Sequence, residues 1–139
     1  MGTRALLHIK ENGLKSKTMA TIYRQYDGYP TGLGMDIYTI LNNGKATLLN
    51  GFGDHQAPAY FNGMGCMGAY LIGELKDRTI GNVYLYPVNS KECGEEYVYT
   101  VYCKDNELMI QVIDIYKETN NVKEMPLKDF ETYINTTLE

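Results

Sequence analysis

The segment YRQYDGYPTGLG, residues 23–34, combines residue types that can hold an anionic ligand. Its Arg24 carries a guanidinium group, which can bind phosphate through two parallel hydrogen bonds. Its glycines lead into an expected helix, and the first turn of a helix has unpaired N–H groups and a partial positive charge. We therefore expect the backbone N–H groups around Thr31, Gly32 and Gly34 to bind an anion together with Arg24.

Aromatic and acidic side chains of the same segment suit a nucleotide-like ligand. Tyr26 and Tyr29 offer rings on which a base can stack. Asp27 can accept hydrogen bonds from ribose hydroxyls or from a base edge. Arg4 lies on the neighbouring expected strand and can add positive charge. The segment thus predicts a ligand-binding pocket with Arg24 at its centre.

A second glycine-rich segment that leads into an expected helix, FNGMGCMG, follows the same logic. Asn62, Gly63, Gly65 and Cys66 can complete the pocket, from the same subunit or across an interface. Neither segment is a P-loop, because no Gly-Lys-Ser/Thr follows. The alternative for both segments is structural: glycine serves a turn that needs positive φ, or it allows tight packing.

Arg24 also has a structural alternative. It can form a salt bridge with Asp27, with Asp36 or with the acids Glu95 and Glu96. The tyrosines, in turn, suit half-buried strands as well as stacking platforms. In that case the segment is a rigid turn, and the protein is an interaction module for host proteins.

A catalytic interpretation depends on fewer residues. Cys66 lies near the start of the second expected helix, where the helix dipole favours a thiolate, and His55 in the preceding loop can act as a base. A buried, inert cysteine is the alternative. Acid/base catalysis has four acidic candidates, Asp27, Asp54, Glu95 and Glu96, but no spacing among them defines a pair. We therefore assign no catalytic residue, and hydrolysis of a nucleotide or phosphodiester is the alternative to simple binding.

Composition excludes several classes of function. The 139 residues suit one domain spanning 1–139, and a net charge of -4 disfavours binding of long nucleic acids. No apolar run is long enough to span a membrane, and no signal peptide is evident. Cys66, Cys93 and Cys103 form no CxxC pair, so we expect reduced thiols in the cytoplasm, no metal and no cofactor.

Hydrophobic periodicity predicts an α+β fold, with an antiparallel sheet packed against about three helices. A β-hairpin is expected over residues 3–26, with its turn at Asn12-Gly13. A three-stranded meander is expected near the C-terminus, with a tight turn at Asp105-Asn106. The expected strands are 3–10, 18–26, 82–87, 96–104 and 107–116, and the expected helices are 31–44, 64–77 and 126–138. Residues 45–63 are expected to be a loop, and the small residues Gly65, Ala69 and Gly73 are expected to let another element or a second subunit approach closely.

Five segments together resemble a family of small uncharacterised proteins of phages and bacteria: MGTRALLHIK, IYRQYDGYPTGLG, FNGMGC, VYLYP and CGEEYVYTVY. The similarity spans residues 1 to about 103. Its members begin with a similar Gly-Thr-Arg strand and carry a Tyr-Arg-Gln/Asn, Asp-Gly/Ser-Tyr-Pro, Gly core. The resemblance implies a phage protein in the cytoplasm of a bacterial host. It also implies an anti-defence role, in which a small homo-oligomeric protein sequesters a nucleotide immune signal of the cyclic oligonucleotide or cyclic ADP-ribose type.

Overall fold

The computed structural model describes residues 2–43, 47–49 and 60–137 of the chain, which fold as α+β as expected. The strands are β1 (Ala5–Lys10), β2 (Thr18–Arg24), β3 (Thr47–Leu49), β4 (Tyr60–Asn62), β5 (Val83–Tyr86), β6 (Tyr97–Lys104), β7 (Glu107–Asp114) and β8 (Val122–Pro126). The helices are α1 (Met35–Asn43), α2 (Gly63–Lys76) and α3 (Phe130–Thr137). A π-helical turn, Pro30–Gly34, precedes α1, and a 3-10 turn, Leu127–Asp129, precedes α3.

Six strands form one mixed sheet in the order β5-β2-β1-β6-β7-β8. The β1–β2 hairpin and the β6–β7 hairpin form as the sequence predicts. The central pair, however, is parallel: β1 runs alongside β6, with Ala5 opposite Tyr97. The expectation of a wholly antiparallel sheet is therefore wrong in this detail, because pairing between distant strands leaves no local signal in the sequence.

The expected C-terminal meander also needs correction. β5 pairs with β2 at one edge of the sheet rather than with β6. The third strand of the meander is β8, which pairs with β7 at the other edge and lies in a stretch for which the sequence predicts no strand. Asp105 and Asn106 do form the predicted tight turn, with φ values of 52° and 64°, as a two-residue hairpin turn requires.

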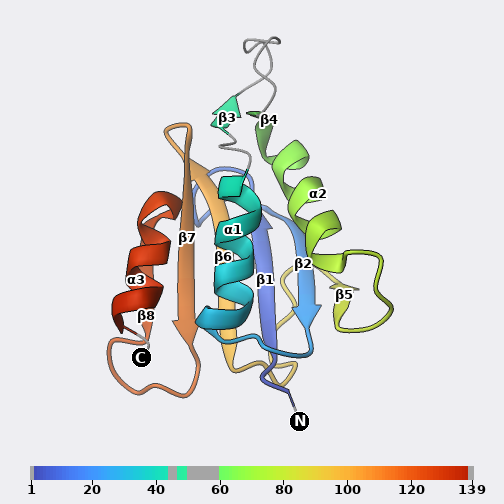
Figure 1. Cartoon of the computed structure of the whole chain (residues 1–139), viewed down its shortest axis with the longest axis vertical. Coiled ribbons are helices and arrows are strands. Elements are labelled where there is room, and N and C mark those ends of the chain that lie inside the picture. Colours follow the sequence, from blue (N-terminus) through green and yellow to red (C-terminus); the bar gives the residue numbers. More distant parts are fainter. Residues whose placement is uncertain (1, 44–46, 50–59, 138–139) are drawn as a thin grey trace.

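The three helices lie on one face of the sheet (Figure 1), with α1 in front of its centre and α2 and α3 on either side. Alternation along β1 points Ala5, Leu7 and Ile9 into this layer, where all three are buried. From α1, Ile37 and Leu41 pack against the same core. One continuous core therefore holds the ends of the strands and the first turns of the helices in fixed positions.

The opposite face of the sheet is covered in part by the connection from β5 to β6. The Asn89 backbone N–H donates a hydrogen bond of 3.2 Å to Thr21 Oγ1, and Gly94 lies against the guanidinium group of Arg4. Leu6 and Tyr102, which point to this face, are almost completely buried. The chain thus has two buried layers, one on each face of the sheet.

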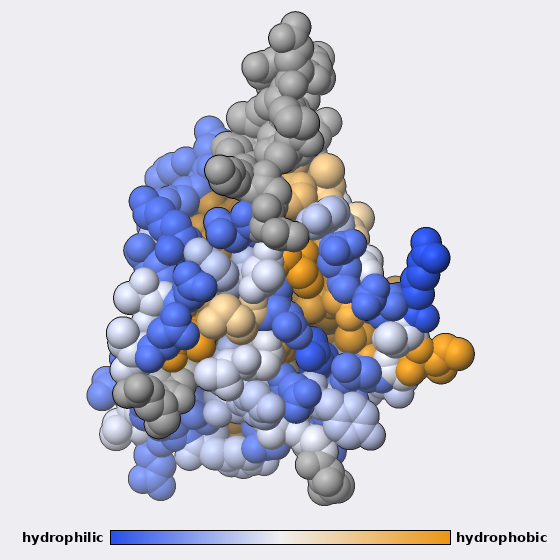
Figure 2. Space-filling view, in the orientation of Figure 1, coloured by the Kyte–Doolittle hydropathy of each residue, from blue (hydrophilic) through white to orange (hydrophobic). Residues whose placement is uncertain are grey.

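The small-residue side of α2 is exposed in the single chain. A Cβ placed on Gly73 would meet open space, and Gly65 and Ala69 are exposed as well. The glycine that does pack closely is Gly68, against Ile9. Figure 2 shows apolar side chains reaching the surface on the α2 side, whereas the α3 side is mostly polar.

Two further expectations concern residues 45–63 and Gly44. β3 and β4 form a short parallel pair within the stretch for which the sequence predicts a loop. Gly44, the last residue of the expected helix 31–44, lies outside the described residues, as do the candidate catalytic residues Asp54 and His55.

Candidate functional site

Arg24, the centre of the predicted anion site, is engaged inside the protein. Its Nε donates a hydrogen bond of 2.8 Å to the Tyr26 carbonyl oxygen. Its Nη2 forms a 3.0 Å ion pair with Asp36 Oδ2 in the first turn of α1. Only 8% of Arg24 is exposed. Asp36 is one of the partners that the sequence offers, so an anion at this position has to compete with its carboxylate.

In the glycine turn that follows, backbone N–H groups are already engaged in hydrogen bonds to nearby carbonyl groups. The Gly32 N–H donates to the Tyr29 carbonyl at 2.8 Å, and the Leu33 N–H donates to the Asp27 carbonyl at 2.8 Å. Pro30 and Gly34 are buried, and Gly34 lies against the rings of Phe130 and Tyr99. Thr31 is exposed. The turn therefore anchors α1 on the core and presents few free donors.

The exposed tyrosines of this segment lie at its surface. The Tyr29 hydroxyl donates a hydrogen bond of 2.9 Å to Asp27 Oδ1, and this bond raises the pKa of Tyr29. Tyr26 is 51% exposed. Asp27 itself has a φ of 57°, which marks a tight backbone turn rather than a strand end.

The remaining predicted residues lie elsewhere. Arg4 is under Gly94, beside the second face of the sheet. Gly63 and Gly65 belong to the first turn of α2, with Cys66 exposed next to them and Asn62 at the end of β4. The structure thus divides the predicted set among three places rather than bringing it into one pocket.

The catalytic alternatives are also separated. His55 lies outside the described residues. Glu95 is buried, and its carboxylate accepts hydrogen bonds from the backbone N–H groups of Glu92 and Cys93, at 3.1 and 2.6 Å. These bonds shape the β5–β6 connection. Within the described residues, no group of three or more His, Cys, Asp and Glu side chains is placed to hold a metal ion.

A cavity of about 470 Å³ lies at the edge of the sheet where β1 and β6 end. We name it the Met64–Cys103 cavity. Three separate segments line it: the turn after β1, the start of α2, and the end of β6 with its turn. The lining residues are Glu11, Asn12, Gly63, Met64, Cys103, Asp105 and Asn106.

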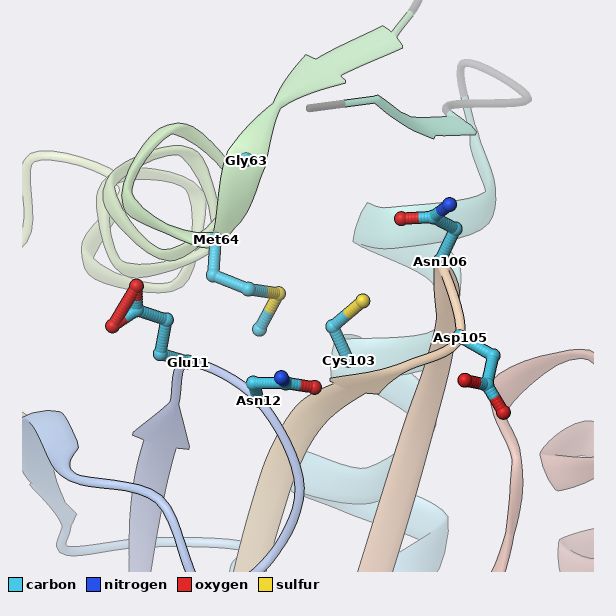
Figure 3. Close-up of a pocket in the computed structure, with 7 residues that line it drawn as sticks. All are labelled: Glu11, Asn12, Gly63, Met64, Cys103, Asp105 and Asn106. Atoms are coloured by element: carbon cyan, nitrogen blue, oxygen red, sulfur yellow. The ribbon is translucent and has the colours of Figure 1, made fainter. Parts of the chain in front are cut away.

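Figure 3 shows how these side chains lie. Met64 and Cys103 face each other across the space, so two sulfur-bearing side chains form its inner walls. Asn12 runs along one side, and Asn106 reaches over another, while the Asp105 carboxylate points away from the centre. The cavity therefore combines a soft, weakly polar interior with amide and carboxylate groups at its rim.

The electrostatics of this cavity are negative. Glu11 and Asp105 carry carboxylates, and the described lining contains no lysine or arginine. Burial raises the pKa of the Cys103 thiol, and the charge of Asp105 raises it further, against a backbone hydrogen bond from Asn106 that lowers it. Cys103 is only 7% exposed. At neutral pH the cavity thus presents a thiol rather than a thiolate.

A second cavity, of about 320 Å³, lies between α1, α2 and the β2–β5 edge. Arg24 lines it, yet Asp36, Glu74 and Asp77 line it as well. Three carboxylates outnumber one guanidinium group that is already paired. Its charge favours a cation over a phosphate.

Sequence reasoning missed most of the Met64–Cys103 cavity. Of its lining, only Gly63 belongs to the predicted site. The turns at Asn12-Gly13 and Asp105-Asn106 are predicted separately, and the Gly13 N–H donates a hydrogen bond of 2.9 Å to the Cys103 carbonyl. These turns meet because β1 and β6 are parallel and end at the same edge. The signal that could have revealed the cavity is therefore the pairing of two distant strands.

Comparison with known proteins gives no relative for this fold or this cavity. No family model matches the chain, and neither a curated protein nor a solved structure matches it. Among the helices of the described part of the chain, none is sufficiently long and apolar to cross a membrane.

Proposed function

We propose that the protein binds a small polar ligand in the Met64–Cys103 cavity and releases it unchanged. The observation that carries this proposal is the cavity itself, about 470 Å³ in volume and lined by three separate chain segments. Ligand pockets for small molecules usually measure about 300–1,000 Å³. A space of this size suits one ligand about as large as a nucleoside.

The lining defines the chemistry of the ligand. Met64 and Cys103 offer weakly polar contacts for the body of the ligand, since a thioether adapts its shape and packs well against rings. The Asn12 side chain offers both a donor and an acceptor. Glu11 and Asp105 add negative charge at the rim, which attracts positive charge. A neutral or cationic ligand that presents N–H or O–H donors therefore fits better than an anionic one.

This conclusion changes the nucleotide-like ligand that the sequence suggests. A base and a ribose carry the N–H and O–H donors that the rim can accept. Phosphate groups would be repelled by Glu11 and Asp105, so they would have to point into solvent, away from the cavity. Sequestration of an immune signal by a phage protein stays a prediction that follows from the resemblance alone.

Binding without turnover is favoured by the state of the thiol. A nucleophilic cysteine reacts as the thiolate. The raised pKa of Cys103 keeps it protonated at neutral pH. The cavity therefore offers a contact surface for a ligand rather than an activated nucleophile.

Self-association belongs to the same proposal. The exposed small residues of α2, Gly65, Ala69 and Gly73, allow a second copy to approach the helix backbone closely. They lie along the same helix, Gly63–Lys76, whose first turn lines the cavity. Light scattering should then give a mass above 15.8 kDa, the mass of one chain.

The test is native mass spectrometry of the protein purified from cells, followed by heating and chromatography of any released molecule. We expect an intact neutral or cationic compound. Asn12→Arg puts a cation at the rim and should abolish retention, because it fills space and repels a cationic ligand. Asn135→Arg, the same change on the exposed side of α3, should retain the ligand. Equal retention by both variants, or release of a chemically altered compound, would contradict the proposal.

A further inference from the structure

A small cavity of about 60 Å³ lies at the other end of the sheet, beneath α3 and beside the buried Pro30. Tyr97 on β6 and Asp114 on β7 are cross-strand partners in its floor. Lys123 on β8, Lys117 in the β7–β8 connection and Tyr133 on α3 also line it, together with the amides of Asn120 and Asn121. We name it the tyrosine–lysine cavity. It is far smaller than the pockets of about 300–1,000 Å³ that usually hold small molecules, so it suits a compact group rather than a nucleoside.

Its cations have no protein partner within the described residues. The ion pairs among the described residues lie elsewhere: they join Arg24 to Asp36 and Lys128 to Glu107. The ammonium groups of Lys117 and Lys123 are therefore farther than salt-bridge distance from Asp114, although all three line one cavity. Two unpaired cations around one small recess create a positive electrostatic potential, which attracts a single anionic group into the recess.

Its hydroxyl groups are donors at neutral pH. Burial raises the pKa of Tyr97, and the charge of Asp114 raises it further. The pKa of Tyr133 is raised by the same two causes in the same order. Both phenols therefore keep their protons, and a neutral phenol can donate its O–H to an oxyanion. Together with the lysines, they surround the recess with donors from four separate elements.

Asp114 is the one group of the set that opposes an anion. The Tyr116 backbone N–H donates to Asp114 Oδ1 at 3.2 Å, and the second carboxylate oxygen has no hydrogen bond among the described residues. A carboxylate repels a fully ionised oxyanion but accepts a hydrogen bond from one that still carries a proton. A phosphomonoester loses its second proton only near pH 6, whereas sulfate has no proton to donate at neutral pH. Asp114 therefore selects for protonated phosphate.

We propose that the tyrosine–lysine cavity binds a phosphate group, free or at the end of a larger ligand. Lys117 and Lys123 neutralise its charge, while Tyr97 and Tyr133 donate hydrogen bonds to its oxygens. Asp114 accepts a hydrogen bond from the remaining P–OH group of the phosphate and repels sulfate, which has no proton to donate. This site is independent of the Met64–Cys103 cavity, which lies at the opposite end of the sheet and shares none of its residues.

The test is calorimetric titration of the full chain with inorganic phosphate and with sulfate, near pH 6 and at matched ionic strength. Phosphate should bind at least tenfold more tightly than sulfate. The double variant Lys117→Gln/Lys123→Gln should weaken phosphate binding by at least tenfold. The control Lys91→Gln/Lys104→Gln removes the same charge from exposed positions outside the cavity and should bind as the unchanged protein does.

A third variant tests the role of the carboxylate. Asp114→Asn removes the charge that repels sulfate, so phosphate and sulfate should then bind within about threefold of each other. Titration with a nucleoside monophosphate distinguishes the source of the group, because tighter binding than inorganic phosphate indicates a larger ligand and equal binding indicates free phosphate. Circular dichroism checks that both double variants are folded. The proposal is overturned if the Lys117/Lys123 and Lys91/Lys104 variants bind phosphate with equal affinity. It is also overturned if the unchanged protein binds sulfate as tightly as it binds phosphate.

Discussion

The Tyr99 hydroxyl donates a buried hydrogen bond of 2.6 Å to the carbonyl oxygen of Gly28. Gly28, in turn, donates its N–H to the Thr3 carbonyl at 2.9 Å. One side chain of the central strand β6 thus fixes the turn that links β2 to the π-helical turn and α1. A hydrogen bond from Tyr99, on the sheet, therefore fixes the glycine segment that the sequence predicts as an anion site.

Removing this hydroxyl should destabilise the protein. Tyr99→Phe leaves the Gly28 carbonyl without its donor, and an unsatisfied buried group costs about 1–3 kcal/mol. We expect the free energy of unfolding to fall by about 1–2 kcal/mol in urea denaturation. Tyr102→Phe is the matched control, because the Tyr102 hydroxyl is buried with no partner among the described residues. It should be neutral or stabilising, and an equal loss in both variants would contradict this account.

Alkaline pH should unfold the protein through its buried phenols. Burial raises the pKa of Tyr99 well above its ordinary value, so the folded state holds the proton more tightly than the unfolded state. The stability that the protonated Tyr99 hydroxyl contributes to the folded state is complete below about pH 10, the pKa of an unfolded tyrosine. This stability is lost as pH rises above that value. The stability difference between the unchanged protein and Tyr99→Phe should therefore shrink above about pH 10. Denaturation curves measured at several pH values check this, and a difference that grows would refute it.

The ion pair between Arg24 and Asp36 should contribute to stability. Asp36→Asn leaves a buried guanidinium group whose remaining hydrogen-bond partner among the described residues is the Tyr26 carbonyl. Because Asp36 itself is half exposed, we expect a loss of about 1–2 kcal/mol rather than that of a fully buried pair. Glu131→Gln, in the first turn of α3, is the control. It changes the interaction with the helix dipole alone and should cost only a few tenths of a kcal/mol. Similar losses in the two variants would show that the pair contributes nothing.

Two glycine-to-alanine changes should have opposite signs. A Cβ on Gly28 would lie 2.7 Å from Ala5 Cβ and 2.8 Å from the Thr3 carbonyl oxygen, so the backbone would have to shift. We expect Gly28→Ala to cost at least about 2 kcal/mol, as overpacking does. A Cβ on Gly73 meets open space, and alanine is favoured in a helix by up to about 1 kcal/mol. Thermal unfolding should place Gly28→Ala below and Gly73→Ala above the unchanged protein.

The cavity thiol should react slowly. In a Cys66→Ser/Cys93→Ser variant, alkylation of Cys103 by iodoacetamide should need a higher pH than an ordinary thiol, because burial raises its pKa. In a Cys93→Ser/Cys103→Ser variant, the exposed Cys66 should react faster at neutral pH. Mass spectrometry follows both rates. Faster reaction of Cys103 would mean an activated thiolate and would favour catalysis over simple binding.

Local signals predicted the elements well. The Asp105-Asn106 dipeptide adopts the positive φ values that a tight hairpin requires, and the apolar stripe of α2 buries Met64, Met67 and Leu71. These features depend on residues a few positions apart. Which strands pair with each other depends on residues far apart in the sequence, so the sequence did not reveal the parallel pair β1–β6 or the edge positions of β5 and β8.

The candidate sites were harder to predict for the same reason. Arg24 has several acidic candidates for a partner in the sequence, and only the packing of α1 against β2 selects Asp36. Lys117 and Lys123 carry no local signal, because their meeting with Tyr97 and Tyr133 depends on how α3 lies over three strands. Residue types indicate which interactions a side chain can make, but the tertiary structure decides which side chains lie next to each other.

The parallel pairing of β1 with β6 also has a consequence for synthesis. Ala5 and Tyr97 are about 90 positions apart in the sequence, yet they are neighbours at the centre of the sheet. While the ribosome is still adding the residues between them, the β1–β2 hairpin has no partner along its inner edge and is prone to aggregate. Closing such a distant contact is slow, so a holdase chaperone on the nascent chain should raise the yield of folded protein.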